Sequence, residues 1–333
     1  MMRLLIVGNP EEIHIGAHFR DAANTLGIAN ELCDTRAAFA ARWLARQWNW
    51  RVRGHRPPRL DFFQRVVLET CEQFAPTHLL ATGIAPLTRA SLIALKARGV
   101  RTLNFLTDDP WSAAQRAGWF LRAVSEYDRV FTPRRANEMD LRRAGCARVE
   151  FLPFAYNPRV HFPYAGAPDE PACCDILFAG GGDADRVPYM DALLRAGWQV
   201  DLYGGYWERF RETRGAARGH VDLAGLRRAV RRARICLNLV RRSNRDDHVM
   251  RSFEIPAMGG CVLTEDSPTH REWFGEEGAA VMYFQTRAEM IEKARWLLER
   301  QAERTRMARA AHVWVTTHRH TYRDRLAAML EMD

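Results

Sequence analysis

Short apolar runs alternate with longer amphipathic segments along the whole chain of 333 residues. Each run is short enough for a strand and lacks the strict alternation of a strand that faces water. Such runs are typical of parallel strands covered on both faces. They fall at residues 3–8, 29–33, 77–83, 100–106 and 128–133, and then at 174–182, 198–207, 235–240, 261–263 and 279–284. The pattern predicts an α/β fold with two series of strands and helices.

A segment with few hydrophobic residues separates the two series. Residues 159–172 carry Pro163, Gly166, Pro168 and Pro171, a composition typical of an interdomain linker. A chain of this length can form two cores. We expect an N-terminal domain over residues 1–160, a C-terminal domain over residues 173–318 and a final helix over residues 319–333.

The stretch from Arg251 to Glu265 predicts a helix that leads into a buried strand. The helix should end at Gly259 and Gly260, because a left-handed cap residue is best without a Cβ atom. Arg251 and Glu254 lie in the first turn, where unpaired backbone N–H groups can receive a phosphate. Taken alone, the stretch fits an ordinary helix–strand unit with a surface Arg and Glu at least as well.

A glycine run follows the first strand of the second series, at Gly180, Gly181 and Gly182. Glycines let the backbone approach a ligand, and Arg186 stands in the first turn of the next helix. Loops of this kind often bind phosphate. Ordinary turns use glycine too, so the motif alone is weak.

Three other positions of the second series are candidates for binding. Tyr203 and Gly204 end a strand, where they could flank a ligand. Asn238 is a polar residue within an apolar run, so it needs a hydrogen-bond partner.

The first series offers polar side chains after two of its strands. His14 and His18 follow the first strand, and Asp108 and Asp109 follow the strand at 100–106. Open α/β sheets bind ligands at this edge. A solvated histidine at a helix start is the commoner arrangement, and either aspartate could simply cap the next helix, predicted over residues 112–125.

Residues 36–53 predict an unusual helix, in which Trp43 and Trp50 share a face with Phe39 and arginines supply charge elsewhere. Such a helix could lie on a membrane surface or hold an acceptor. The alternative that we favour from sequence is an amphipathic helix packed on the sheet.

Composition and charge limit the kinds of partner, metal site and membrane segment that the chain can have. The net charge is +9, but it is spread along the chain and almost all carried by arginine, so nucleic acid is not a favoured partner. The seven cysteines form no CxxC pair and predict neither a disulfide framework nor a metal site. No apolar run is long enough to cross a bilayer, and the N-terminal residues do not form a signal peptide, so we expect a cytoplasmic protein.

The pieces of the second series resemble the CgeB-like glycosyltransferases, a family related to the group-one glycosyltransferases. The segments that carry the resemblance are ILFAGGGDADR (176–186), VDLYGGYW (200–207), ICLNLVRR (235–242), RSFEIPAMGGCVLTED (251–266), REWFGEEG (271–278), VMYFQTRAEMIEKARWLL (281–298) and HTYRDRL (320–326). In the first series, FLTDDPW (105–111) and FLPFAYNP (151–158) are similar to segments of the same family.

This resemblance implies a GT-B fold, with two Rossmann-like domains facing across a cleft and a C-terminal helix that crosses back to the first domain. The C-terminal domain would hold a nucleotide diphosphate sugar (a UDP-, GDP- or dTDP-sugar), and the N-terminal domain would hold the acceptor. Glu254 matches the family position that accepts the ribose hydroxyls, and Arg251 would contact the diphosphate. Phe253, beside Glu254, belongs to the same implied site. The backbone of Gly259 and Gly260, or the carboxylate of Glu265 or Asp266, could approach the sugar.

There is one departure from the wider pattern. Many group-one enzymes carry a second Glu eight residues before the position of Glu254, and here that residue is Asp246. Either Asp246 or Asp247 could substitute for that Glu, or the sugar contact could be made differently. The sugar and the stereochemical outcome therefore stay open, although the resemblance suggests retention. Asp183-Ala184-Asp185 has the spacing of a DxD metal-binding motif, but it sits in the phosphate loop. We therefore expect a metal-independent reaction. If a base is needed, the candidates are Asp108, Asp109 and His14.

Two other functions remain open at this point. One is a sugar-nucleotide epimerase of GT-B fold, which would use the same donor site without an acceptor. The other is a non-catalytic basic protein that binds nucleic acid or a membrane surface. A transferase could act on a protein, a glycan or a lipid-linked glycan, and peripheral contact with the inner face of the membrane would suit the last.

Overall fold

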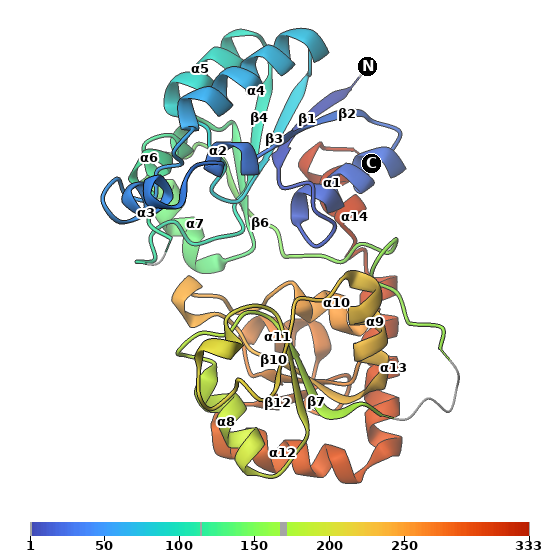
Figure 1. Ribbon diagram of the computed structural model, residues 1–333. Helices are drawn as coiled ribbons and strands as arrows, with labels where there is room; N and C mark the ends of the chain where they lie inside the picture. Colours follow the sequence, from blue (N-terminus) through green and yellow to red (C-terminus); the bar gives the residue numbers. More distant parts are fainter. Residues whose placement is uncertain (1, 114, 167–171, 333) are drawn as a thin grey trace. The chain divides into compact units, whose positions relative to one another are not determined.

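Two parallel sheets organise the described residues, 2–113, 115–166 and 172–332, of the computed structural model (Figure 1). Each sheet is the centre of one unit. Unit 1 comprises Met1–Pro153, Ser243–Arg245 and Tyr322–Asp333, and unit 2 comprises Phe154–Arg242 and Asp246–Thr321. The division lies at Pro153, whereas the sequence places the end of the first domain at residue 160. Part of the predicted linker, residues 167–171, lies outside the described residues.

The sheet of unit 1 has the order β2-β1-β3-β4-β5-β6, and every pairing in it is parallel. Its strands are β1 (Arg3–Gly8), β2 (Ala29–Asp34), β3 (His78–Thr82), β4 (Arg101–Phe105), β5 (Arg129–Thr132) and β6 (Val149–Phe151). Its helices are α1 (Ile15–Thr25), α2 (Arg36–Phe39), α3 (Trp43–Arg51), α4 (Leu60–Phe74), α5 (Arg89–Ala97), α6 (Gly118–Leu121), η1 (Val124–Glu126), α7 (Arg135–Arg143) and α14 (Tyr322–Met329).

The sheet of unit 2 has the order β12-β11-β10-β7-β8-β9 and is also parallel. Its strands are β7 (Cys174–Ala179), β8 (Val200–Tyr203), β9 (Ala217–Gly219), β10 (Ala233–Asn238), β11 (Val262–Glu265) and β12 (Met282–Phe284). The helices are α8 (Val187–Arg195), η2 (Trp207–Arg209), α9 (Leu223–Arg232), η3 (Arg242–Asn244, which overlaps the unit 1 segment), α10 (Arg251–Ala257), α11 (Pro268–Phe274), α12 (Arg287–Glu299) and α13 (Gln301–Thr317).

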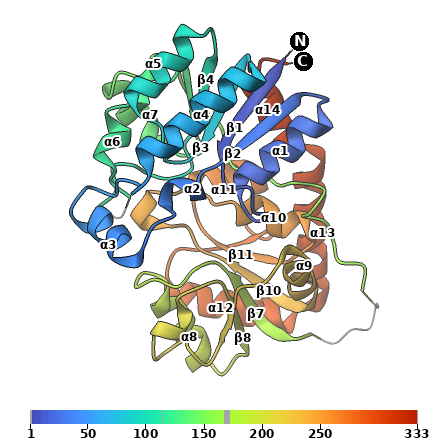
Figure 2. The same cartoon turned by 45° about the horizontal axis from the view of Figure 1, so that its top comes forward.

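The apolar runs form the cores, as their composition predicts. Side chains such as Leu5 and Leu79 are fully buried in unit 1, and Ile176 and Leu263 are fully buried in unit 2. Helices lie around each sheet (Figures 1 and 2), and their buried side chains, such as Phe63 in unit 1 and Met190 in unit 2, complete the cores. The predicted α/β class is therefore confirmed.

The chain returns to unit 1 through α14, which packs on α1. The ring of Tyr322 lies 5.0 Å from that of His18 and 5.3 Å from that of Phe19. Near the end of the chain, Arg129 donates to the backbone oxygen of Met329 at 3.2 Å. Both termini consequently lie in unit 1 (Figure 2).

Two predicted helices are wrong in detail. The helix predicted over 36–53 is broken at Ala40, whose ψ of 93° is extended, and its second half, α3, turns large apolar side chains outward instead of packing on the sheet. The helix predicted over 112–125 is replaced by turns, α6 and η1. The Asp109 carboxylate takes the N–H of Trp111 at 3.0 Å, so a turn forms at this point.

Smaller differences concern strand boundaries. Val149–Phe151 forms β6 in the first sheet and Ala217–Gly219 forms β9 in the second, although neither segment is among the apolar runs that predict strands. β11 begins at Val262, after Cys261. All seven cysteines are free thiols, as predicted. No helix within the described ranges is long and apolar enough to span a bilayer.

Candidate functional site

The strand order of unit 2 creates a topological switch point between β7 and β10. The chain moves from β7 to β8 and β9 on one side of the sheet and then to β10, β11 and β12 on the other. Loops that leave two neighbouring strands in opposite directions open a crevice at the carboxyl edge, where ligands bind in such sheets. The loops after β7 and β10 therefore define the candidate site.

The glycines after β7 and β8 hold these two loops against each other. The N–H of Gly180 donates to the oxygen of Tyr203 at 2.8 Å, and that of Gly182 donates to Gly205 at 2.9 Å. A Cβ atom on Gly204 would lie 2.5 Å from the Gly180 oxygen, and one on Gly182 would lie 2.9 Å from the Trp207 ring. Side chains are thus excluded at both positions. Gly181 is less confined, since its nearest neighbour would lie at 3.6 Å.

Arg186 brings a buried guanidinium to the same edge, at the start of α8. Its Nη1 donates to the Gly181 oxygen at 3.0 Å and lies 3.7 Å from the Asp183 carboxylate, while its Nε is buried without a hydrogen-bond partner among the described residues. Burial, and then the charge of Arg241, lower the pKa of Arg186. The protein therefore leaves a buried cation with an unused donor beside a glycine loop, which favours an anionic ligand.

Asp183 shapes this loop and does not resemble a metal ligand. One of its oxygens accepts the N–H groups of Asp185 at 3.1 Å and of Arg186 at 3.0 Å. It therefore caps the turn into α8.

Another group with ligand-type atoms, Cys173, Cys174 and Asp201, lies close together at the opposite edge of the sheet. There Arg218 occupies Asp201 at 2.7 Å, and burial raises the pKa of the Cys174 thiol, so thiolate ligands are disfavoured.

The start of α10 reaches the end of β7. Arg251 donates from Nε to the oxygen of Ala179, the last residue of β7, at 3.3 Å, and its guanidinium pairs with Glu254. Glu254 is buried, and its Oε1 lies 3.7 Å from Nε2 of His161. Since Nδ1 of His161 accepts the N–H of Asn157 at 3.0 Å, the ring proton sits on Nε2 and faces the carboxylate. The guanidinium of Arg251 and the ring of His161 thus flank the buried Glu254 carboxylate.

Gly259 and Gly260 lie at the other end of α10, away from Arg251. Gly259 has a φ of +82°, the left-handed cap expected from the sequence. A Cβ atom on Gly260 would lie 2.8 Å from Ile255 and 3.0 Å from Cys236. The two glycines serve the turn and the packing before β11.

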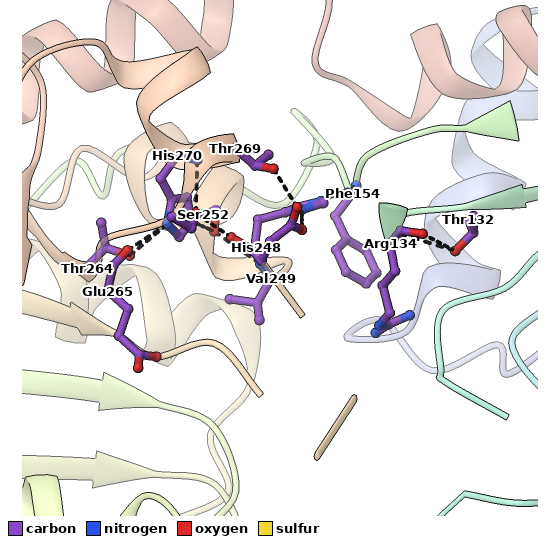
Figure 3. Close-up of polar contacts among 12 residues, drawn as sticks. Thr132, Arg134, Phe154, His248, Val249, Ser252, Thr264, Glu265, Thr269 and His270 are labelled. Carbon is purple, nitrogen blue, oxygen red and sulfur yellow. Dashed lines mark hydrogen bonds and ion pairs between the residues drawn. The ribbon is translucent and has the colours of Figure 1, made fainter. Parts of the chain in front are cut away.

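A buried polar network fixes α10 to the neighbouring strands (Figure 3). Asn238 donates to Ser252 at 3.1 Å and to Thr264 at 3.3 Å. Nδ1 of His270 faces the oxygen of Glu265 at 2.9 Å and must carry a proton, so its Nε2 accepts from Ser252 at 2.8 Å. Asn238 thus finds the partner that its position demands, within the protein.

Phe253 is also structural in character. It is fully buried, and its ring lies 4.9 Å from that of Trp273 and 5.1 Å from that of His320. The side chains of Asn238 and Phe253 therefore make contacts within unit 2 that fix the helix carrying Arg251 and Glu254.

Two further carboxylates, those of Glu265 and Asp246, belong to the same edge of the sheet of unit 2. Glu265 ends β11, and its oxygens accept the N–H of Val240 at 2.7 Å and the guanidinium of Arg242 at 3.1 Å. Asp246 acts on Arg186, where its negative charge opposes the lowering of the pKa. The position that departs from the group-one pattern is therefore close to the buried cation.

The sequence predicts Asp247 only as an alternative to Asp246, and His248 and Thr269 are not predicted as site residues. Asp247 binds Nδ1 of His248 at 2.9 Å and the hydroxyl of Thr269 at 2.5 Å, and the N–H of Phe154 donates to Nε2 of His248 at 3.4 Å (Figure 3). The signal was the DDH run before α10, which reads from sequence only as a charged loop. His161 was missed because its segment reads as a linker.

In unit 1 the corresponding edge carries His14, Asp108 and Asp109. His14 precedes α1, and its side chain is 46% exposed and lies 3.4 Å from Glu11. Asp108 is half-buried and accepts from Thr107 at 3.2 Å. The two residues follow β1 and β4, which are both neighbours of β3 in the sheet.

Asp109 differs from Asp108 in being completely buried. Arg245, from the segment of the 241–250 loop that belongs to unit 1, donates to both of its oxygens at 2.6 and 3.0 Å. Asn137 adds a bond at 2.9 Å. Burial would raise the pKa of Asp109, but Arg245, the Trp111 N–H and Asn137 together lower it. An acceptor this well satisfied is a poor proton acceptor.

Arg134 holds the loop that carries Asp108. Its guanidinium donates to the backbone oxygen of Thr107 at 2.6 Å, and its own N–H donates to Thr132 at 3.1 Å (Figure 3). A buried arginine at the end of a strand gave no sequence signal for this task.

Comparisons with known proteins agree with this architecture. Residues 186–331 match a protein family described as glycosyl transferase-like. The sucrose-phosphate synthase of Thermosynechococcus elongatus is similar in structure, with a TM-score of 0.73 and 13% identity, over 99% of this chain and 98% of that one. The fold is GT-B.

Two further GT-B structures are similar over nearly the whole chain. T4 phage BGT, in complex with its UDP-glucose substrate, has a TM-score of 0.61 and 11% identity, over 100% of both chains. A putative UDP-N-acetylglucosamine 2-epimerase from Listeria monocytogenes has a TM-score of 0.59 and 13% identity, over 100% of this chain and 98% of that one. A comparison with curated protein sequences gives no match. The family match and the GT-B fold together support glycosyl transfer, and hence an enzyme.

Proposed function

We propose that this protein transfers a sugar from a nucleoside diphosphate sugar, bound by unit 2, to an acceptor bound by unit 1. The observation that carries the proposal is the buried guanidinium of Arg186, which has an unused Nε donor beside the glycine loop after β7. A diphosphate would supply the acceptor that this donor lacks, and the glycine loop beside Arg186 would let the phosphate approach the backbone closely.

Arg251 and Glu254 suit the remaining parts of such a donor. The Glu254 carboxylate can accept two vicinal ribose hydroxyls, which each donate one hydrogen bond. In the chain as described, Arg251 occupies that carboxylate. On binding, Arg251 would turn toward the diphosphate and leave Glu254 to the ribose. Positive charge near the leaving diphosphate would lower the barrier to cleavage of the glycosidic bond.

Several finer assignments belong to the same proposal. The chain would be a CgeB-like enzyme that uses no metal, with retention at the anomeric carbon. Asp108 is the preferred candidate base, because Asp109 is occupied by Arg245 and Asn137. The acceptor would be a protein, a glycan or a lipid-linked glycan, reached in the cytoplasm or at the inner face of the membrane. Gly181, Tyr203, Gly204 and Asp246 would line the donor.

The test is a thermal-shift screen of nucleoside diphosphates and their sugars. We expect at least one of them to raise the melting temperature of the wild type. Arg186→Met should weaken that ligand about 100-fold, since a desolvated charge-assisted contact to phosphate is lost. Glu254→Ala should weaken nucleosides with a free ribose and affect inorganic diphosphate less.

Arg195→Met is the matched control. Arg195 lies on the same helix, α8, but its side chain is 77% exposed and pairs only with Asp191. The control should bind like the wild type. An absence of any nucleotide response in the wild type, or equal effects of the two arginine variants, would contradict the proposal.

An epimerase remains the second candidate, because a putative epimerase of this fold is among the similar structures. It would convert the sugar of the nucleotide without an acceptor. Incubation of the protein with the nucleotide sugar that binds best separates the two functions. An isomerised nucleotide sugar indicates the epimerase, whereas free nucleoside diphosphate with a sugar conjugate or free sugar indicates the transferase.

A further inference from the structure

Helix α3 of unit 1 turns its largest apolar side chains toward solvent. Trp43, Leu44, Trp48 and Trp50 are 62%, 73%, 61% and 48% exposed. Trp43 and Trp50 are seven residues apart and Leu44 and Trp48 four apart, so they form two adjacent rows on the helix surface. Exposed apolar side chains scattered singly are ordinary, but three tryptophans and a leucine within eight residues form a contiguous patch.

The surroundings of this patch are purely basic. Residues 36–60 contain seven arginines and no Asp or Glu. Arg36 and Arg56 pair with acids outside this range. Four of the remaining exposed arginines, Arg42, Arg46, Arg51 and Arg53, lie on or beside α3, and no carboxylate of the described part of the chain lies at ion-pairing distance from them. The surface of α3 therefore presents exposed apolar side chains together with arginine charges that no carboxylate of the described residues neutralises.

Contacts within unit 1 fix the C-terminal end of α3 and the residues that follow it. Trp50 stacks on His55 with ring centroids 4.0 Å apart, and the backbone oxygen of His55 accepts the indole N–H of buried Trp119 at 3.3 Å. Asn49 is the buried residue of α3 and bonds the oxygen of Ala45 at 2.8 Å. Helix α3 lies at the margin of unit 1 in both views (Figures 1 and 2).

We propose that α3 and its flanking arginines form an anchor that lies on the surface of an anionic lipid bilayer. Indole rings prefer the boundary between headgroups and acyl chains, because one part of the ring is apolar and the N–H can stay hydrated. Arginines in the same segment are attracted to anionic headgroups. An acidic protein or a nucleic acid would use the charge but would leave Leu44 and the two tryptophan rows exposed, so the combination favours a bilayer.

This inference goes beyond the proposed transfer reaction and does not depend on it. It concerns a surface of unit 1 that contains no residue of the candidate donor site. Donor binding and membrane binding can therefore succeed or fail separately. If both hold, the acceptor is presented at a membrane surface.

The experiment is co-sedimentation of the purified protein with large unilamellar vesicles of phosphatidylcholine alone or with 30% phosphatidylglycerol. We expect binding to the anionic vesicles that weakens as salt is raised, and at least tenfold weaker binding to the neutral ones. Trp43→Ala/Trp48→Ala and, separately, Arg42→Gln/Arg46→Gln should each reduce anionic binding at least tenfold. The nucleotide-induced thermal shift should be unchanged in both double variants.

Ile93→Ala/Met139→Ala is the control, since these side chains of unit 1 are 46% and 58% exposed but lie in α5 and α7. It should bind vesicles like the wild type. If the tryptophan variant fails to fold, Leu44→Gln at the most exposed position replaces it. The proposal is overturned if the wild type ignores anionic vesicles, if the control loses as much binding as the α3 variants, or if only duplex DNA binds.

Discussion

Both sheets are parallel and have a switch point at their first strand, but their carboxyl edges differ in how far the ionic groups are buried. In unit 2 the first strand, β7, has two strands on one side and three on the other, whereas in unit 1 the first strand, β1, has one and four. Both arrangements create a switch point. At that of unit 2 the ionic groups are buried, as Arg186 and Glu254 are, while at that of unit 1 His14 and Asp108 stay partly exposed.

This difference suggests a division of labour. A buried cation and buried carboxylates are costly to keep, so a protein retains them where a ligand of fixed charge and shape has to be recognised. A diphosphate and a ribose are constant parts of a nucleotide sugar. An open edge with half-exposed polar groups suits an acceptor that is recognised mainly by the placement of one hydroxyl. Substitutions at the two edges can test whether unit 2 binds its ligand through buried ionic groups and unit 1 through half-exposed ones.

The largest expected effect separates two adjacent aspartates of unit 1. Asp108→Asn should slow the release of nucleoside diphosphate from the donor about 100-fold or more, as the loss of a general base does, and should leave the melting temperature unchanged. Asp109→Asn should instead lower the free energy of unfolding by about 2–3 kcal/mol, because Arg245, Asn137 and the Trp111 N–H lose an ionised acceptor. Urea unfolding and a coupled assay measure the two quantities.

The proposed difference between the edges is wrong if Asp109 is the base and Asp108 is the residue that stabilises the fold. An Asp109→Asn variant of normal stability but without activity would place the base at the buried position. It would also mean that the edge of unit 1 is as preorganised as that of unit 2. A binding measurement with the nucleotide should show wild-type affinity for both variants, since neither residue belongs to unit 2.

The next effect sharpens the picture of the glycine loops in unit 2. Gly204→Ala should lower the free energy of unfolding by about 2 kcal/mol or more, because its φ is +124° and the new Cβ would meet the Gly180 oxygen at 2.5 Å. Gly197→Ala, with a φ of +85° and open space around it, should cost only about 1 kcal/mol. Differential scanning calorimetry of the two variants separates the clash from the strain.

Gly181→Ala completes the series with a binding readout. Its Cβ would make ordinary contacts at 3.6 Å, so stability should stay near that of the wild type. Nucleotide affinity should nevertheless fall, because the methyl group would occupy space that a phosphate needs next to Arg186. If Gly181→Ala binds normally, the glycines serve only the packing of the loops and the phosphate lies elsewhere.

Much of the fold could be predicted because buried parallel strands leave a local signature. Runs such as residues 3–8 and 235–240 are apolar throughout, and the glycines after β7 and β8 mark tight turns in the sequence itself. β9 was missed for the same physical reason, since Ala217–Gly219 has no apolar run and is strand only through its pairing with β8. Similarly, nothing local indicates that α3 turns its tryptophans outward.

The glycines and Arg186 of the candidate site stand out in the sequence, whereas the side chains that hold the site in place do not. His161 and Glu254 are 93 positions apart in the sequence, yet their side chains lie within 3.7 Å. Likewise the predicted ligand residues Asn238 and Phe253 proved to be enclosed by side chains from distant elements. Residue type and local position identified which side chains need partners. Only the tertiary structure decides whether a partner comes from the protein or from a ligand.

The smallest expected effect concerns the network beneath α10 and is a dependence on pH. Burial lowers the pKa of His270 from 6.5 to about 4, although the oxygen of Glu265 partly opposes this shift. The unfolded state therefore binds the proton more readily, so the stabilising contribution is fully present above pH 6.5 and is lost as the pH falls toward 4. Between pH 7 and pH 5.5 the loss should be about 1 kcal/mol.

His270→Gln, measured by urea unfolding at both pH values, should show a smaller loss than the wild type, although it is less stable at pH 7. His318→Gln at an exposed position should keep the wild-type difference. An identical pH response of wild type and His270→Gln would mean that the network beneath α10 opens to solvent and that the edge of unit 2 is less rigid than that of unit 1.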